Sequence, residues 1–451
     1  VILNTLVDMY AKCGSLDEAH KIFTSLQHPT VVSWGALIAG YAMNDQYPLA
    51  IKLFKEMNYR SITISSCIAS CILKVCGNLQ YLRGGRHVHA QMIEHELQSD
   101  MSGPLLIEVY AKCKSFEDAE SIFELCKLNV ESWAAIIVGY SNHGYFDCVF
   151  RLYRMMMHIQ KIKPSNVIFS AILKACSSVG NIQKGRIIHE CIVWTGMQTD
   201  IIIGNTLVDM YAKFGSIEEA YHVFSTLPHP DHISWGAMMT GYVEHGYDVA
   251  TLELLEKLYH QGINPNEASF LSGLKACGNI GDAHGGRLVH GIAIETGVST
   301  NTLLGSTIVG FYIKSGFLDE ARKVFDTLEN RNWFSWCALI AGYAQHGHGE
   351  KALEYFDKMQ HEGLSPNEVT LLCSLKACSS IGAIDKGIEM HTQIVREGLH
   401  EKYSSIANAL VDMYAKCGEV EKAQAVFDEL QVKDVVSWTA LMTGYAQLGK
   451  D

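Results

Sequence analysis

A serine followed by a tryptophan returns about every 100 residues along this chain. The tryptophans are Trp34, Trp133, Trp235, Trp336 and Trp438, which lie 99, 102, 101 and 102 residues apart. Two further phrases recur between them: Lys-x-Cys, ending at Cys76, Cys176, Cys277 and Cys378, and a tyrosine phrase beginning at Tyr10, Tyr110, Tyr211, Tyr312 and Tyr414. Such a regular period predicts a stack of similar repeats, each burying its apolar face against its neighbours.

Each block of about 100 residues divides into three types of repeat. The Ser-Trp repeats are 31–65, 130–165, 232–266, 333–367 and the partial 435–451. The Lys-x-Cys repeats are 66–100, 166–200, 267–301 and 368–403. The tyrosine repeats are 1–30, 101–129, 201–231, 302–332 and 404–434. We therefore predict one continuous repeat array over residues 1–451.

Every repeat has the pattern of two helices joined by a turn. In the first repeat, Gly14 ends one helix, and apolar residues return at helical spacing over 16–26. Ser15 and Glu18 have the spacing of a capping box, in which each side chain accepts a free backbone N–H of the other residue. The sequence therefore predicts an all-α solenoid of helical hairpins.

Composition narrows the class of protein. The chain has 48% apolar and 19% charged residues, as expected of a folded protein. No apolar run approaches the roughly 18 residues that cross a membrane, so we expect no membrane association. The 14 cysteines include no Cys-x-x-Cys spacing, which favours buried free thiols over disulfides. The net charge of −12 argues against non-specific nucleic-acid binding unless the basic residues cluster.

Three stretches resemble the pentatricopeptide repeat family, specifically its plant PLS class. They are Val31-Val32-Ser33-Trp34 with Gly40-Tyr41, the run 207–213 with Met210-Tyr211-Ala212-Lys213, and the run 185–189, Gly-Arg-Ile-Ile-His. Repeat lengths of about 35, 35 and 31 residues also match that class, and the resemblance covers the whole chain. It implies a right-handed superhelix of helical hairpins that binds single-stranded RNA in its groove, one base for each repeat.

In the family, the fifth residue of a repeat and its last residue contact the base edge. Carried onto this sequence, the resemblance gives the reading pairs Asn205 with Asp231, Ser306 with Asn332, Asn408 with Asp434, and Asn4 with Thr30. An Asn–Asp pair implies uracil and a Ser–Asn pair implies adenine. The Ser-Trp repeats give the weaker contact candidates Gly236, Asn266, Cys337, Asn367 and Thr439. Because glycine offers no side-chain hydrogen bond, such repeats are expected to hold RNA without reading it.

Two rows of lysines recur within this acidic chain. Lys12, Lys112, Lys213, Lys314 and Lys416 lie two helical turns after the fifth position and on the same face. A second row consists of Lys74, Lys174, Lys275 and Lys376. If both rows line the groove, they form a stripe that faces phosphates. The alternative is a solvated outer face that only keeps the helices soluble.

Catalytic chemistry finds little support in the sequence. The histidines His89, His189, His290 and His391 recur on apolar helical stripes, which favours hydrogen-bonded packing over metal binding. A deaminase-like domain, which follows many PLS arrays, needs His-x-Glu and a later Pro-Cys-x-x-Cys. Here 348–350 gives the one His-x-Glu, within a repeat turn, and no Pro-Cys pair occurs. We therefore expect neither an enzyme nor a cofactor in this chain.

The resemblance implies the specificity arm of an RNA-editing or RNA-processing factor in a mitochondrion or chloroplast. Its partners would be single-stranded organellar RNA and other proteins of an editing complex. The chain begins at Val1 within a repeat phrase, so we interpret it as part of a longer protein. Read in order, repeats 201–434 predict the partial site U-n-n-A-n-n-U. The alternative is a protein-interaction scaffold, or a degenerate repeat protein with little RNA specificity, which the net charge favours.

Overall fold

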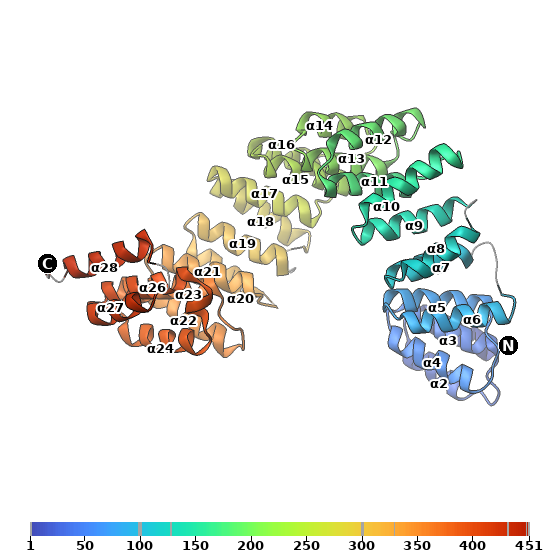
Figure 1. Ribbon diagram of the computed structural model, residues 1–451, viewed down its shortest axis with the longest axis horizontal. Coiled ribbons are helices and arrows are strands. Elements are labelled where there is room, and N and C mark those ends of the chain that lie inside the picture. Colours follow the sequence, from blue (N-terminus) through green and yellow to red (C-terminus); the bar gives the residue numbers. More distant parts are fainter. Residues whose placement is uncertain are drawn as a thin grey trace. The chain divides into compact units, whose positions relative to one another are not determined.

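Helices account for every regular element in the part of the chain that the structure describes. This computed structural model describes residues 2–97, 102–126, 129–298, 302–328, 330–430, 433–447 and 449. The chain divides into an N-terminal body, Val1–His229, and a C-terminal body, Pro230–Asp451. Each body is a stack of helical pairs (Figure 1). The predicted all-α solenoid of helical hairpins is therefore confirmed.

The N-terminal body alternates first and second helices of successive repeats. Its first helices are α1 (Ile2–Lys12), α3 (Val31–Met43), α5 (Ser66–Asn78), α7 (Ser102–Lys112), α9 (Val130–Asn142), α11 (Asn166–Val179) and α13 (Ile201–Lys213). Its second helices are α2 (Leu16–Thr24), α4 (Tyr47–Tyr59), α6 (Leu82–Glu94), α8 (Phe116–Leu125), α10 (Phe146–Arg154), α12 (Ile182–Trp194) and α14 (Ile217–Thr226). A π-helical turn, η1 (Met155–Ile159), continues α10.

The C-terminal body has the same alternation. Its first helices are α15 (His232–Glu244), α17 (Glu267–Ile280), α19 (Thr302–Lys314), α21 (Trp333–Gln345), α23 (Glu368–Ile381), α26 (Ser404–Lys416) and α28 (Val435–Gln447). Its second helices are α16 (Asp248–His260), α18 (Ala283–Glu295), α20 (Leu318–Thr327), α22 (Gly349–His361), α24 (Ile384–Arg396) and α27 (Val420–Glu429). A short helix, α25 (Leu399–Lys402), precedes α26.

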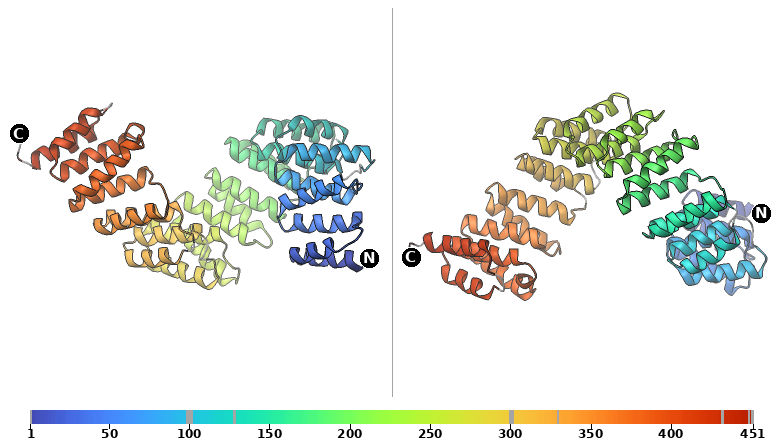
Figure 2. Two further views of the ribbon diagram at one scale, coloured as in Figure 1. Left: turned by 90° about the horizontal axis from the view of Figure 1, so that it is seen from below. Right: turned by 45° about the horizontal axis from the view of Figure 1, so that its top comes forward.

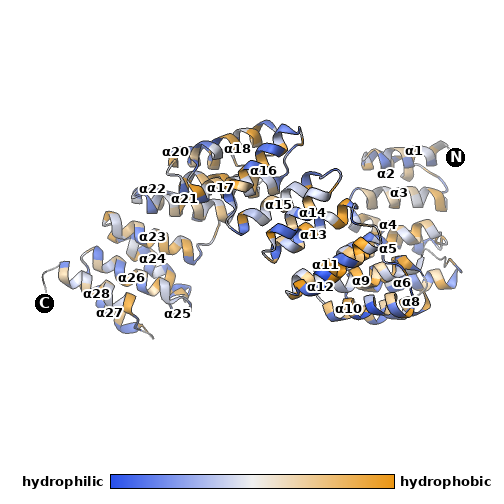
Figure 3. Ribbon diagram, turned by 90° about the horizontal axis from the view of Figure 1, so that it is seen from above, coloured by the Kyte–Doolittle hydropathy of each residue, from blue (hydrophilic) through white to orange (hydrophobic). Residues whose placement is uncertain are grey.

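Within each body the first helices form one layer and the second helices another (Figure 2). In the N-terminal body α1, α3, α5, α7, α9, α11 and α13 contact one another in succession, and α15 to α28 repeat this order. Each second helix packs against its own first helix, and most also pack against the first helix of the next repeat. Most helices therefore carry both hydrophobic and hydrophilic residues (Figure 3).

Aromatic rings join consecutive repeats. Trp34, Trp133 and Trp336 are fully buried. Each lies edge-on to a phenylalanine from the second helix of the preceding repeat, with ring centroids 4.7 Å apart: Phe23–Trp34, Phe123–Trp133 and Phe325–Trp336. Edge-to-face pairs of this kind add about 0.5–1.5 kcal/mol beyond the buried area. The tryptophan of the recurring Ser-Trp pair thus packs against the preceding repeat in these three places.

The recurring histidines also join repeats, as the predicted packing role requires. Nδ1 of each lies 2.8–2.9 Å from the hydroxyl of the tyrosine that opens the next tyrosine phrase: His89–Tyr110, His189–Tyr211, His290–Tyr312 and His391–Tyr414. Burial lowers the pKa of all four imidazoles. Close by, Arg186 binds Glu219 of the following repeat at 2.6 Å. These contacts fix the spacing of neighbouring hairpins.

Close approach of the first helices depends on glycine. A Cβ atom at Gly139 of α9 would lie 2.5 Å from the Cβ of Ala111 on α7, which is shorter than real Cβ contacts. At Gly40 of α3 a Cβ would collide with Ala11 of α1. Glycine at these positions therefore lets consecutive first helices pack backbone to backbone.

The predicted capping box at Ser15 is wrong. Ser15 makes no side-chain cap hydrogen bond, and the carboxylate of Glu18 pairs with Lys21 at 2.6 Å. Reciprocal capping boxes occur instead at the start of first helices, where Thr30 pairs with Ser33. The Ser15 backbone N–H already donates to the Tyr10 carbonyl at 3.0 Å, so it is not available to the Glu18 carboxylate.

The cysteines are all free thiols, as predicted. The prediction that they are buried holds for Cys76, Cys176, Cys277, Cys337 and Cys378 but not for the other nine. No described helix has the length and apolarity needed to cross a membrane.

Candidate RNA-binding groove

Three of the predicted reading pairs are in direct contact. Asn4 on α1 donates its Nδ2–H to the Thr30 hydroxyl at 3.3 Å. On α19 and α26 the partners are equally close: the Ser306 hydroxyl donates to Asn332 Oδ1 at 3.0 Å, and Asn408 Nδ2 donates to Asp434 Oδ2 at 3.0 Å. Residues 26 positions apart in sequence therefore form one polar cluster in each of these repeats.

The fourth pair falls on the boundary between the two bodies. Asn205 lies on α13 of the N-terminal body and is half-buried. Asp231 stands immediately before α15 in the C-terminal body and accepts the backbone N–H groups of Ile233 and Ser234 at 3.0 and 2.9 Å. The two residues of this predicted pair therefore belong to different bodies, and the pair stays a prediction.

The last residue of a repeat has a second role that the sequence interpretation missed. It is the N-cap of the next first helix, and its side-chain oxygen accepts a backbone N–H there. This holds for Thr30, Asp231, Asn266, Asn332, Asn367 and Asp434. The signal was present in the sequence, since a serine or threonine three residues later completes a capping box in several repeats.

An aspartate and an asparagine that cap a helix differ in which hydrogen-bonding groups remain available for a base. Asp434 uses Oδ1 for the Ser437 N–H at 2.8 Å and Oδ2 for Asn408. The Ser437 N–H, followed by the Asn408 amide, lowers the pKa of Asp434, so this carboxyl stays charged at neutral pH. Asn332 uses its single Oδ1 for both the Ser335 N–H and the Ser306 hydroxyl. Within the described residues, the NH₂ group of Asn332 has no protein partner and is free to donate.

The weaker candidates of the Ser-Trp repeats are also brought together. Cys337 Sγ lies 3.7 Å from Asn367 Oδ1, and burial raises the pKa of this thiol to about 12, so it stays neutral. A Cβ at Gly236 would lie 2.9 Å from Asn266 Oδ1. The Asn266 amide meanwhile donates to the His232 carbonyl at 2.9 Å.

Thr439, in the last partial repeat, donates its hydroxyl to the Val435 carbonyl of its own helix at 2.6 Å. Its hydroxyl hydrogen is therefore already used within α28, although the residue is exposed.

One lysine from each row, Lys12 and Lys74, lines a groove in the first three repeats. A groove of about 1030 Å³ runs along α1, α3 and α5, and its lining includes Asn4, Lys12, Lys74 and Asn78. Its floor is largely apolar, with Gly35 among the lining residues. A reading residue and a lysine from each row therefore share one surface in the first three repeats.

Most lysines of the first row are paired with an acid on their own helix. The carboxylate four residues earlier lies 2.7–2.8 Å from the ammonium in the pairs Asp8–Lys12, Glu108–Lys112, Asp209–Lys213 and Asp412–Lys416. Exposed i,i+4 pairs are worth only about 0.3–0.5 kcal/mol, so an incoming phosphate could displace the acid. Lys314 differs because Gly310 stands in the place of the acid, and it has no ion pair among the described residues.

A metal site would need several nitrogen, sulfur or carboxylate ligands close together among the described residues. In that part of the chain no three histidine, cysteine, aspartate or glutamate side chains gather in a way that could hold a metal ion. Polar pairs and lysines along the first helices therefore make up the candidate site.

Sequence profiles of pentatricopeptide repeats match much of the chain. The PPR repeat profile matches residues 1–28, 32–62, 105–129, 131–159, 205–227, 306–332, 405–435 and 436–450. A second profile, the PPR repeat family, matches 331–380.

Curated relatives carry the same repeats. A chloroplastic pentatricopeptide repeat-containing protein of Arabidopsis thaliana is 29% identical over 446 residues, which is 98% of this chain and 55% of the relative. A mitochondrial one from the same plant is 29% identical over 476 residues, covering 100% and 52%. The chain thus spans about half the length of these relatives.

Solved structures share the fold. The crystal structure of the pentatricopeptide repeat protein PPR10 in complex with an 18-nt psaJ RNA element aligns with a TM-score of 0.64 and 17% identity, over 99% of this chain and 76% of the other. PPR10 from maize aligns with a TM-score of 0.58 and 19% identity, over 99% and 66%.

Proposed function

Because the chain belongs to the pentatricopeptide repeat family, we propose that it binds single-stranded RNA along its first helices and reads part of the sequence. The observation that carries this proposal is the contact within the pairs Asn4–Thr30, Ser306–Asn332 and Asn408–Asp434. In each pair the side chain of the last residue is held in place by its helix cap. Groups fixed in advance lose little entropy when a base edge binds to them.

Apolar side chains beside these pairs support base packing. Ile202 and Leu303, the second residues of their repeats, are 53% and 52% exposed. Aliphatic groups exposed to this degree on the face of the reading residues can lie against base planes. PPR10, which has the same fold, was solved in complex with an RNA element, and this supports RNA as the ligand of the present chain.

The readable repeats make the proposal specific. Asn–Asp pairs for uracil and a Ser–Asn pair for adenine give the pattern U-n-n-A-n-n-U across repeats 201–434. A selection from random single-stranded RNA should enrich this spacing at physiological salt. A variant with alanine at Asn408 should enrich RNA that has lost only the last uracil. Enrichment of unrelated sequences, or none, would refute the reading frame.

We further propose that the array belongs to the PLS class and acts as the specificity arm of an organellar RNA-editing or RNA-processing factor. The alternation of three repeat types and the chloroplastic and mitochondrial names of the relatives support this assignment. Other proteins of such a factor would then be partners of this chain.

A protein-interaction scaffold is the second candidate. Ion pairing of Lys12, Lys112, Lys213 and Lys416 with neighbouring acids favours it, because the groove then carries little net positive charge. If the chain does not bind RNA even at low salt, the scaffold function is favoured. Affinity that falls steeply as salt rises would decide for RNA.

A further inference from the structure

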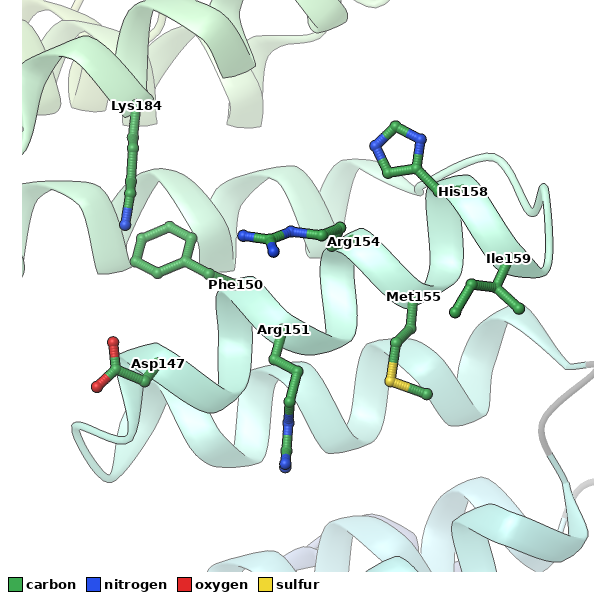
Figure 4. Close-up of a pocket in the computed structure, with 8 residues that line it drawn as sticks. All are labelled: Asp147, Phe150, Arg151, Arg154, Met155, His158, Ile159 and Lys184. Carbon is green, nitrogen blue, oxygen red and sulfur yellow. The ribbon is translucent and has the colours of Figure 1, made fainter.

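A further candidate surface lies on the second helices of the repeats, whereas the reading residues lie on or just before the first helices. In the N-terminal body a pocket of about 420 Å³ lies between α10–η1 and α12. Its lining consists of Asp147, Phe150, Arg151, Arg154, Met155, His158, Ile159 and Lys184 (Figure 4). Three permanent cations and one carboxylate thus surround it in a chain whose net charge is −12.

Two of these cations have no counter-ion in the part of the chain that the structure describes. The Lys184 ammonium lies 4.1 Å from the centre of the Phe150 ring, and Arg154 extends its guanidinium toward the same ring (Figure 4). Among the described residues neither Lys184 nor Arg154 forms an ion pair, and Asp147 pairs with neither of them. Arg151 points the other way (Figure 4) and approaches Glu120 at 3.9 Å.

The same junction in the fourth block indicates which group is missing. Counted from the repeat tryptophan, Arg154 corresponds to Asp357, and counted from the recurring histidine, Lys184 corresponds to Lys386. There Asp357 Oδ1 lies 2.7 Å from the Lys386 ammonium. The second block therefore keeps the lysine but replaces its carboxylate by a further cation.

Backbone geometry sets this junction apart as well. The helix that carries Arg154 changes to the π-helical turn η1, whereas its counterparts α4, α16 and α22 stay α-helical for 13 residues. Single π-turns inserted in α-helices are frequent at functional sites. Here the turn carries His158 and Ile159 to the rim of the pocket, where Ile159 is 68% exposed.

We propose that this pocket binds an acidic segment of a partner protein. A carboxylate of the segment lies between Arg154 and Lys184, in the role that Asp357 has in the fourth block, and an apolar side chain covers Phe150 and Ile159. The fourth block favours a carboxylate as the bound anion, because a carboxylate is the group that the counterpart lysine binds there. This site does not depend on the RNA-binding proposal.

The decisive variant supplies the missing carboxylate from the chain itself. Arg154→Asp restores the acid–lysine pair of the fourth block, so we expect it to fold with a Tm no lower than wild type. Lys323→Asp is the matched control: it makes the same change of charge at an exposed residue of α20. Binding of a fluorescent peptide built of Glu-Glu-Leu repeats to the full chain would be followed by anisotropy.

We expect wild type and Lys323→Asp to bind this peptide equally, and Arg154→Asp to bind at least about tenfold more weakly, as the loss of one charge-assisted hydrogen bond implies. A Gln-Gln-Leu peptide should bind as weakly to wild type. Equal affinity of Arg154→Asp and wild type would overturn the proposal, as would no detectable peptide binding by wild type. RNA binding that falls in parallel in Arg154→Asp would assign the pocket to nucleic acid instead.

Discussion

Repeats 302–332 and 404–434 have the same backbone frame but different charges. In the first, the reading pair Ser306–Asn332 is neutral, and Lys314 forms no ion pair with any residue that the structure describes. In the second, Asp434 carries a charge, and Lys416 is bound by Asp412 at 2.8 Å. A helix cap accepts an amide or a carboxylate equally well, so the fold tolerates either pair. The charge of each repeat is therefore set by its reading pair and by the residue four places before its lysine.

Removing the cap should have the largest effect. Asn332→Ala loses both the cap of α21 and the contact with Ser306, so we expect local destabilisation of about 1 kcal/mol and about tenfold weaker binding of U-n-n-A-n-n-U RNA. Hydrogen exchange of α21 and filter binding measure the two effects. Asn332→Asp keeps the cap and should preserve stability while shifting the preference away from adenine. Equal destabilisation by both substitutions would contradict the capping role.

The two lysines should differ in the salt dependence of binding. Lys314→Ala should lower the slope of log affinity against log salt by about 0.7, the value for one phosphate of a single strand. Lys416→Ala should lower it less, because Asp412 already neutralises that ammonium. Titrations from low to moderate salt give both slopes. Identical slopes for the two variants would show that the intrahelical acid has no influence.

Adding an acid beside Lys314 and removing the one beside Lys416 should reverse the difference in salt dependence between the two repeats. A side chain at Gly310 meets nothing within 4 Å, so Gly310→Asp fits and should pair with Lys314. Asp412→Asn should release Lys416 and raise RNA affinity about twofold at low salt, consistent with the small energy of exposed pairs. A gain from Gly310→Asp, which adds negative charge, would argue against phosphate contact at Lys314.

Acid should weaken the contacts His290–Tyr312 and His391–Tyr414, which join these two repeats to the repeats before them. Burial lowers the pKa of His290 and His391 from the usual 6.5, so the unfolded chain takes up protons first. Stability is therefore complete above about pH 6.5 and falls as the pH drops toward the folded-state pKa values. Thermal melts at pH 7.5 and 5.5 should show this loss, and His290→Gln should reduce it. Rising stability over this interval would contradict the assignment.

The sequence predicted the stack of helical hairpins because the same residue types recur at nearly constant spacing along the whole chain. Tryptophan, glycine and histidine recur because each has one packing solution, such as Trp34 against Phe23. The family resemblance pointed to the fifth-position and last-position residues, and three of these pairs are in contact, while their role in reading bases stays a prediction.

Two features that the sequence interpretation missed differ in whether residue spacing alone could have revealed them. The acid partners of the lysines stand four residues earlier and could have been recognised from spacing alone, as with Asp209 and Lys213. The outer pocket could not, because Arg154 and Lys184 are brought together only by the packing of two hairpins and by a π-turn that no phrase in the sequence marks.

The double use of the cap residue restricts how such a protein can change its target over evolutionary time. Where the last residue also caps the next helix, asparagine, aspartate, serine and threonine are preferred, so exchanges among these four cost the fold least. Mutation among them redirects one nucleotide while the hairpin stays intact. Mutation outside them damages the neighbouring repeat first. The residue types that can read a base from the last position of a repeat are thus limited by those that can start a helix.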